Sequence, residues 1–157
     1  MSTLTNRLLG SARLDIQSYE EVEADRQANW QALAVVIASS IAAALGTGLR
    51  EVGSTLALLL VAIISWIIWV LLTLVIGTKL LPGRETQADF GQVLRTTGFS
   101  ASPGILRVFG LVPVVGPYIF IAATIWMLFS FVVAVRQALD YESTGRALAV
   151  CLLGWII

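Results

Sequence analysis

Long apolar runs separated by short polar segments dominate the hydrophobic pattern from Trp30 onward. Three of these runs, at about 30–49, 54–78 and 117–135, approach or exceed the roughly 20 residues that cross a bilayer as a helix. A run at 101–116 is shorter, and one at 144–157 reaches only about 21 Å as a helix. We predict an all-α integral membrane protein with a five-span helical bundle, whose third span is short and broken by Pro113.

The first 28 residues differ from the rest of the chain. Apolar residues recur there at three- and four-residue spacing: Leu4, Leu8, Ala12, Ile16 and Tyr19. This spacing predicts an amphipathic helix at the membrane interface. The acidic stretch 19–25 fits a solvated helix face, with docking to a partner as the alternative. We therefore divide the chain into an interfacial N-terminal segment, 1–28, and a membrane-embedded bundle, 29–157.

The stretch 90–116 starts polar and ends apolar. In 90–99 an apolar face opposes a polar face that contains Arg95, which is typical of a helix at the water–lipid boundary. In the second half, Arg107 costs about 2.5–3.5 kcal/mol to insert, and the eight large apolar residues of 105–115 return roughly 2.4–5 kcal/mol. The 16 residues of 101–116 span about 24 Å, less than the roughly 30 Å hydrocarbon core. We expect a short span packed inside the bundle, with a re-entrant half-helix as the alternative.

Arg107 is a candidate contact inside the membrane. No acidic residue or histidine falls within the predicted spans, so its partner is a lipid headgroup, a backbone carbonyl or another subunit. The alternative is a transport or channel pathway, because charged residues inside membranes often mark such pathways.

Three tryptophans, Trp66, Trp69 and Trp126, fall near the middle of predicted spans, although tryptophan usually lies at the membrane interface. Each indole N–H needs an acceptor when buried. We expect these side chains to pack within the bundle, with contact to a partner or to a lipid, quinone or pigment as the alternative.

Small residues recur at every fourth position of the first span, and such rows let helix backbones approach closely. The row is Ala34, Ala38, Ala42 and Gly46. We expect it to be a helix-packing face, used either within this chain or between this chain and a second copy or another subunit.

The Lys and Arg residues predict the orientation. A tight turn at 50–53 carries Arg50 on one side, and eight basic residues fall on the other: Arg7, Arg13, Arg26, Lys79, Arg84, Arg95, Arg136 and Arg146. Basic residues concentrate on the cytoplasmic side, so we expect a cytoplasmic N-terminus in the cell membrane. Five of them form a candidate surface for anionic lipid headgroups: Lys79, Arg84, Arg95, Arg136 and Arg146.

The composition limits the partners, cofactors and activities that we expect of this protein. The sequence is 57% hydrophobic and 13% charged, with no net charge, so we expect no nucleic-acid partner. It has no histidine and one cysteine, Cys151, which we expect to pack in an apolar run. The loop carboxylates Asp89, Asp140 and Glu142 show no spacing typical of a catalytic or metal site. We therefore predict no cofactor, no metal and no enzymatic activity.

Three motifs resemble those of the Yip family, the Ypt/Rab-interacting multi-pass membrane proteins, and point to its prokaryotic branch. They are Gly77-Thr78-Lys79-Leu80-Leu81-Pro82-Gly83, then Phe90-Gly91-Gln92-Val93-Leu94-Arg95-Thr96-Thr97-Gly98-Phe99 with Pro103, and Val135-Arg136-Gln137-Ala138-Leu139-Asp140 with Thr144-Gly145-Arg146-Ala147. The resemblance implies a five-span bundle with a cytoplasmic N-terminus. In eukaryotic members it implies vesicle trafficking and small-GTPase binding, but this chain lacks their Tyr-Gly-Pro type of N-terminal motif.

These observations favour a small accessory or scaffolding subunit of a larger membrane complex, in the bacterial inner membrane. Its expected partners are membrane lipids and other integral membrane subunits or a second copy. The alternatives are a small transporter or channel component that uses Arg107, and a membrane-organisation or trafficking protein like the eukaryotic relatives. The apolar run continues to Ile157, which leaves open whether further residues follow.

Overall fold

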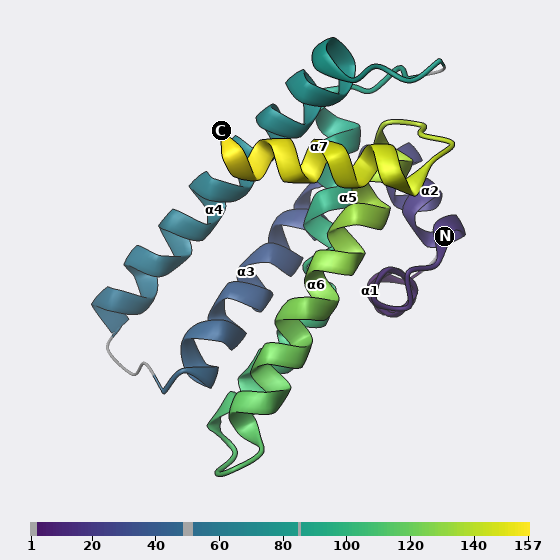
Figure 1. Ribbon diagram of the computed structural model, residues 1–157. Helices are drawn as coiled ribbons and strands as arrows, with labels where there is room; N and C mark the ends of the chain where they lie inside the picture. Colours follow the sequence, from purple (N-terminus) through teal and green to yellow (C-terminus); the bar gives the residue numbers. More distant parts are fainter. Residues whose placement is uncertain (1–2, 49–51, 85) are drawn as a thin grey trace.

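The computed structural model describes residues 3–48, 52–84 and 86–157, and these ranges fold into helices joined by loops (Figure 1). The short helices α1 (Leu4–Ala12) and α2 (Ile16–Ala24) precede the long helices α3 (Ala28–Gly46) and α4 (Val52–Val75). A π-helical turn, Ile76–Leu80, extends α4. There follow α5 (Phe90–Phe99), a 3-10 helix (Ser102–Leu111), α6 (Gly116–Ala138) and α7 (Thr144–Ile156). Arg50 and Glu51 of the predicted tight turn lie outside the described residues.

Three helices in the described part of the chain are long and apolar enough to cross a membrane: 28–46, 53–80 and 116–138. They correspond to the predicted first, second and fourth spans. They run along one common direction, and the loop 112–115 lies at the opposite end of the bundle from residues 81–84, 86–89 and 139–143 (Figure 1). All-helical membrane architecture is therefore confirmed for the described residues.

The expectation that 90–99 exposes one face to water and the other to lipid is wrong. Asp89 and Gln92 start α5 with a capping box, in which Asp89 Oδ1 accepts from the Gln92 N–H at 2.8 Å. Beyond this first turn both faces are covered, because α5 packs against α2, α3, α4 and α6. Val93 is fully buried, and Arg95 on the polar face is only 4% exposed. Sequence periodicity could not reveal that α5 is enclosed, because it describes the two faces of one helix and not the helices that cover them.

The expected proline-broken span is a 3-10 helix, Ser102–Leu111, with Pro103 in its first turn. It follows α5 with a break at 100–101, and α5 with this segment reaches about 35 Å at the usual rises. It packs mainly against α3 and α6. The backbones approach closely at glycines, because a Cβ on Gly110 would lie 2.6 Å from the Gly46 oxygen. The predicted third span, 101–116, is therefore a 3-10 helix over most of its length, and it reaches the length of a spanning segment only together with α5.

Helix α7 lies across α4 and α6 instead of along them (Figure 1). It has 13 residues, fewer than a spanning helix needs. Its buried face joins a core with the π-helical turn and the end of α6: Ile76, Val135, Leu139, Tyr141, Ala147, Val150 and Cys151. The fifth span, and with it the five-span count, stays a prediction.

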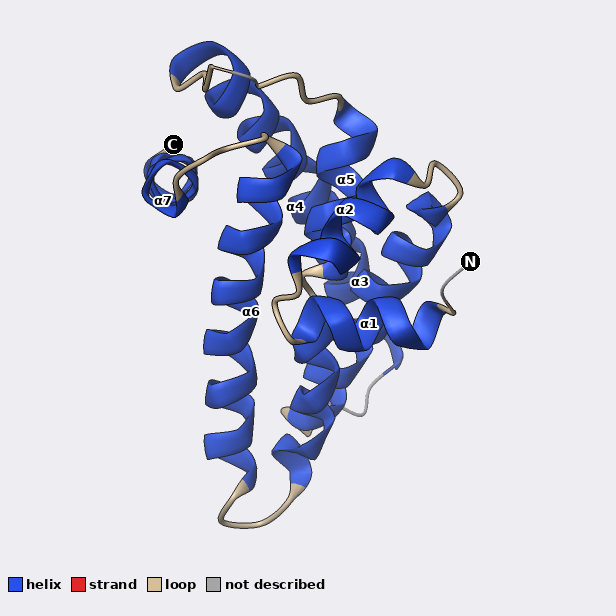
Figure 2. Cartoon of the chain, turned by 90° about the vertical axis from the view of Figure 1, so that its right-hand side faces the viewer, coloured by secondary structure: helices blue, strands red, loops and turns tan. Residues whose placement is uncertain are grey.

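The N-terminal segment folds as two short helices, where the sequence pattern predicted one. Thr3 and Asp15 cap them, and Leu14 between them has φ 62°. Both helices lie on the flank of the bundle beside α5 and α6 (Figure 2). Tyr19 of α2 is fully buried, and its hydroxyl lies 2.7 Å from Ser130 Oγ of α6. This segment is therefore packed onto the bundle through specific contacts.

Candidate functional site: a cavity beside Arg107

A cavity of about 570 Å³ lies between α3, α4 and α6, with Trp155 of α7 also in its lining. Most of its wall is apolar, and Val61, Leu128 and Phe131 contribute to it. A few polar groups interrupt the wall: Ser39, Ser40, Thr47, Thr97, Ser100 and Arg107. A largely apolar cavity with few polar groups is the usual form of a small-molecule site.

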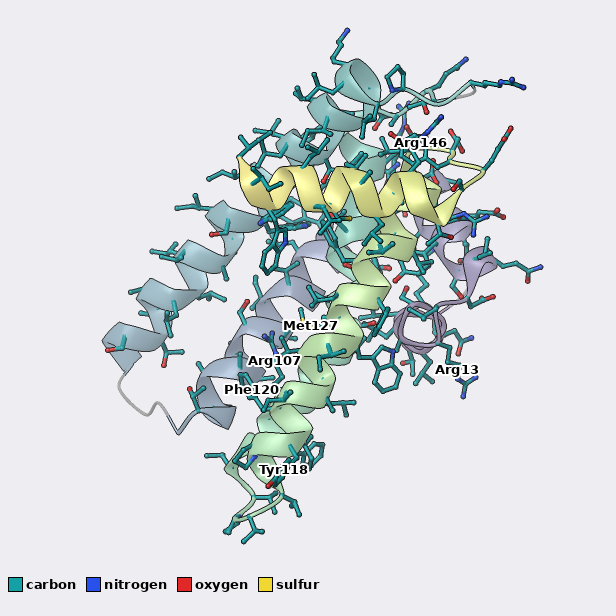
Figure 3. The ribbon with its side chains drawn as sticks, in the orientation of Figure 1. Arg13, Arg107, Tyr118, Phe120, Met127 and Arg146 are labelled. Carbon is teal, nitrogen blue, oxygen red and sulfur yellow. The ribbon has the colours of Figure 1, made fainter. Side chains whose placement is uncertain are left out.

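Arg107 lies in the interior of the bundle, between α3 and α6, close to Phe120 and Met127 (Figure 3). Its Nη2 donates to the Ser39 carbonyl at 3.0 Å and to Ser39 Oγ at 2.8 Å. Its Nε donates to the Gly104 carbonyl at 3.1 Å, and the guanidinium carbon lies 5.7 Å from the centre of the Phe120 ring. Of the three partners expected for Arg107, namely a lipid headgroup, a backbone carbonyl or another subunit, the structure shows backbone carbonyls.

Arg107 contacts no carboxylate among the described residues. The ion pairs within these ranges join Arg7 to Glu21 and to Asp25, on the flank of the bundle. The guanidinium is therefore held by neutral oxygens and an aromatic ring.

Two of the three mid-span tryptophans line the cavity. Trp66 Nε1 donates to Thr97 Oγ1 of α5 at 3.1 Å, so its acceptor comes from a neighbouring helix. Trp69 packs edge-on against Phe131, with ring centres 5.8 Å apart, and also contacts Trp155. Trp126 faces the other flank, where its Nε1 donates to the Ala12 carbonyl of α1 at 2.8 Å. Trp126 therefore anchors the N-terminal segment and does not line the cavity.

The row of small residues on α3 divides into two parts. Ala42 and Gly46 are buried, and Gly46 packs against the 3-10 helix. Ala34 and Ala38 are exposed. One half of the row thus faces this chain, and the other half is accessible to lipid or to another protein.

The five candidate headgroup residues also fall into different environments. Lys79, Arg84 and Arg146 are exposed, and Arg136 is half-buried. Arg136 Nε donates to the Tyr141 carbonyl at 3.1 Å, and Arg146 stacks on the Tyr141 ring at 5.7 Å. Arg95 is an exception, because it is buried and donates to backbone carbonyls of α2. The structure leaves Arg95 no exposed charge with which to contact a headgroup.

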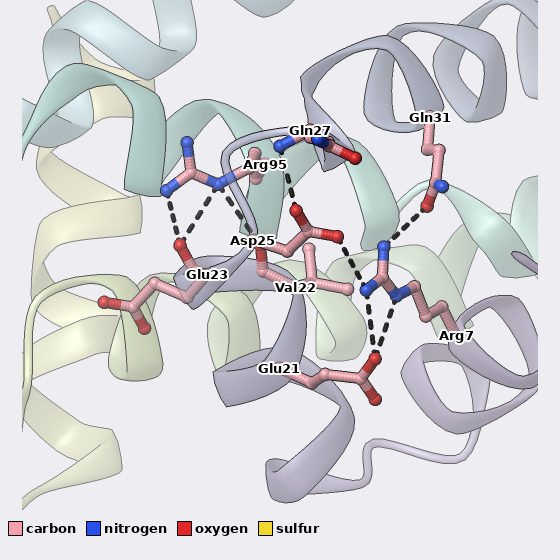
Figure 4. A network of polar contacts seen from close by, with 8 residues as sticks. All are labelled: Arg7, Glu21, Val22, Glu23, Asp25, Gln27, Gln31 and Arg95. Carbon is pink, nitrogen blue, oxygen red and sulfur yellow. Dashed lines mark hydrogen bonds and ion pairs between the residues drawn. The ribbon is translucent and has the colours of Figure 1, made fainter. Parts of the chain in front are cut away.

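A polar network joins the N-terminal helices to the bundle (Figure 4). Arg7 is 5% exposed and donates to Glu21, to Asp25 at 2.8 Å and to Gln31 at 2.8 Å. The hydrogen bond from Arg7 holds the pKa of Asp25 below its usual range. This network could not be predicted from the sequence, because Arg7 and Glu21 look like ordinary surface residues of short helices.

Glu23 occupies the opposite side of α2 from Asp25. Its carboxylate accepts from Gln92 Nε2 at 2.9 Å, and partial burial with the nearby Asp140 raises its pKa to about 7. Arg95 opposes that shift. Glu23 is thus a carboxylate that titrates near neutral pH, outside the long apolar helices.

Two of the loop carboxylates considered for catalysis, Asp89 and Asp140, lie at helix ends. Asp89 caps α5, and Asp140 is exposed at a left-handed position with φ 50° that ends α6. The described ranges contain no group of three or more His, Cys, Asp or Glu side chains that could hold a metal ion.

The comparisons with known proteins agree with the architecture. No curated protein and no solved structure matches the chain. The family model described as Yip1 domain matches residues 16–157, from the start of α2 through α7. This match covers most of the chain and includes the cavity, Arg95 and Arg107. The chain therefore belongs to the Yip1 domain family, as its three motifs predicted.

Proposed function

We propose that this Yip1 family membrane protein is a non-catalytic accessory or scaffolding subunit that packs against other integral membrane subunits or a second copy of itself. The observation that carries the proposal is the exposed face of α3. Exposed residues follow one another there at three- and four-residue spacing: Trp30, Ala34, Ala38, Ile41 and Leu45. Ala34 and Ala38 form a small-xxx-small pair, which lets a second helix approach closely.

The proposed setting is the bacterial inner membrane, with the N-terminus in the cytoplasm. The excess of Lys and Arg at one side supports this orientation. In the proposed five-pass arrangement α3, α4 and α6 cross as single helices, α5 crosses with the 3-10 helix, and α7 begins the fifth pass. The exposed Lys79, Arg84 and Arg146, with Arg136, are then placed to contact anionic headgroups on the cytoplasmic side.

Native gel electrophoresis tests the subunit role. The chain is purified untagged from its own membrane in mild detergent, and co-migrating proteins are identified by mass spectrometry. We expect a complex of defined stoichiometry in the wild type and loss of that complex when Ala34 and Ala38 are both changed to Leu. Ala57→Leu, an exposed position on α4, is the matched control and should leave the complex intact. A wild-type chain that migrates as a monomer would overturn the proposal.

A thiol-labelling experiment tests the orientation. In a Cys151→Ser background, Thr5→Cys places one thiol on exposed α1. A membrane-impermeant reagent should label it in opened membranes and not in intact cells. Labelling in intact cells would reverse the proposed orientation.

A small transporter or channel component is the second candidate. The observation in its favour is a charged side chain, Arg107, on the wall of a cavity between apolar helices. Arg107→Leu separates the two functions, because loss of transport with retained assembly supports the transporter. Retained transport of every tested solute in this variant would exclude the pathway through Arg107.

A further inference from the structure

The side chain of Arg107 extends inward, away from the nearer end of α3. Its backbone carbonyl lies against Gly46, the last residue of α3. The guanidinium nevertheless reaches Ser39, which is about 10 Å back along that helix. Long basic side chains in membranes usually extend toward the nearest polar surface. Arg107 extends toward the middle of the bundle, so its hydrogen bonds to the protein, and not access to water, position its side chain.

The charge at this position lacks a counter-charge within 3–48, 52–84 and 86–157. The hydrogen bonds of Arg107 go to neutral oxygens of Ser39 and Gly104, and its Nη1 has no hydrogen-bond partner among these residues. Guanidinium stays protonated even when buried. Arg107 is half-buried, and a partly desolvated charge without a counter-charge favours an anionic ligand, so the site is complementary to an anion.

The size of the cavity limits what the anion can belong to. A volume of about 570 Å³ falls in the range of roughly 300–1,000 Å³ that is typical of small-molecule sites. A helix of about 10 Å diameter needs about 400 Å³ for each turn, so the cavity holds little more than one turn of a partner helix. Its apolar wall includes Val61, Trp69 and Phe131, which suit a hydrocarbon chain.

We propose that this cavity binds a single-chain membrane lipid acid, with its carboxylate on Arg107 and its chain against the aromatic wall of Trp69, Phe131 and Trp155. A carboxylate matches the planar donors of guanidinium and accepts from the Nη1, for which the described residues supply no partner. The volume of this partly open cavity suits one hydrocarbon chain, and a two-chain phospholipid would leave much of its second chain outside it. This binding role is independent of the accessory-subunit role.

Tryptophan fluorescence tests the proposal on the full chain in detergent micelles. Three of the five tryptophans line the cavity, namely Trp66, Trp69 and Trp155, so doxyl-labelled stearate bound there quenches the emission. We expect a saturable quenching phase that unlabelled palmitate removes and that its uncharged methyl ester does not remove. Arg107→Gln should weaken palmitate binding roughly tenfold, the size expected for one charge-assisted hydrogen bond. Arg13→Gln, at an exposed position outside the cavity and outside the headgroup surface, is the matched control and should bind as the wild type.

A second variant keeps the test independent of Arg107. Ala62 lines the cavity on α4, and Ala62→Phe fills part of the volume without touching the charge. It should abolish the saturable phase. The proposal is overturned when the ester competes as well as the acid, or when both variants bind palmitate like the wild type. Displacement of the probe by phosphatidylglycerol at lower concentration than by palmitate would overturn the choice of a lipid acid.

Discussion

Arg95 of α5 donates to the main-chain carbonyl of Glu23, at the end of α2, through both Nε and Nη2. Its Nε also reaches the Val22 carbonyl at 3.1 Å, and its Nη1 donates to Asn29 Oδ1 at 3.1 Å. The last carbonyls of a helix have no partner within that helix. One buried guanidinium therefore satisfies the end of α2 and fastens the N-terminal helices to the centre of the bundle.

Replacing Arg95 should loosen this attachment. Arg95→Leu leaves buried carbonyls of α2 without donors, and we expect it to lower the free energy of unfolding by about 2–4 kcal/mol. Thermal unfolding in detergent, followed by tryptophan emission, measures the change. Arg84→Leu removes an exposed arginine and should shift the midpoint little. Equal midpoints for the two variants would contradict the role of Arg95.

The hydroxyl of Tyr19 links α2 to α6. It lies 2.7 Å from Ser130 Oγ and 3.2 Å from the Ser11 carbonyl, and burial raises the pKa of this phenol above its usual range. Tyr19→Phe keeps the ring and removes the hydroxyl, so we expect a loss of about 1–2 kcal/mol in the free energy of unfolding. A double-mutant cycle with Ser130→Ala should show coupling between the two positions. Additive effects would show that the hydroxyls act independently.

Protonation of Glu23 should stabilise the fold near neutral pH. Its pKa is raised from 4.5 to about 7 by burial and by the charges of Asp140, Glu20 and Asp89, against the attraction of Arg95. The folded chain therefore binds more protons than the unfolded chain between these values, and stability falls as the pH rises through this window. Glu23→Gln should flatten the dependence of the unfolding midpoint on pH between about 5 and 8. An unchanged slope in this variant would assign the dependence to another group.

Asp25 does not contribute to the pH dependence of the unfolding midpoint between about 5 and 8, because its pKa is shifted in the opposite direction. The hydrogen bond from Arg7 lowers the pKa of Asp25 below its ordinary 3.8. Its contribution to stability is present above that value and is lost only as the pH falls further. Glu23 and Asp25 therefore act in separate pH windows.

A side chain at Gly46 should separate α3 from the 3-10 helix. A Cβ there would overlap the carbonyl of Arg107, so one of the two backbones must move. We expect Gly46→Ala to reduce the free energy of unfolding by about 1–3 kcal/mol, as overpacking usually does. Gly53→Ala is the matched control, since a Cβ at Gly53 meets nothing within 4 Å and alanine favours the helix. Unfolding midpoints of the two variants should therefore move in opposite directions.

The hydrophobic pattern alone was enough to place α3, α4 and α6. Backbone N–H and C=O groups inside a membrane must form hydrogen bonds within the protein, because lipid offers none. A long apolar run therefore strongly favours a helix. The Yip motifs were also readable from the chain, and the family match confirms them. Trp66 illustrates the limit of such reasoning, because the sequence required an acceptor for its indole N–H but could not select Thr97.

The tertiary structure decided what the polar residues of this chain do. Arg95 and Arg107 lie in consecutive helices of the stretch 90–116, yet one fastens α2 to the bundle and the other faces a cavity. Their roles depend on which backbone carbonyls come within reach after packing, and glycines such as Gly46 set those distances. Periodicity reports only the faces of one helix, so it could not show that α5 is enclosed or that α7 lies across its neighbours. The hydrophobic pattern was enough to identify the helical, apolar segments, whereas long-range packing determined where each charge finds its partner.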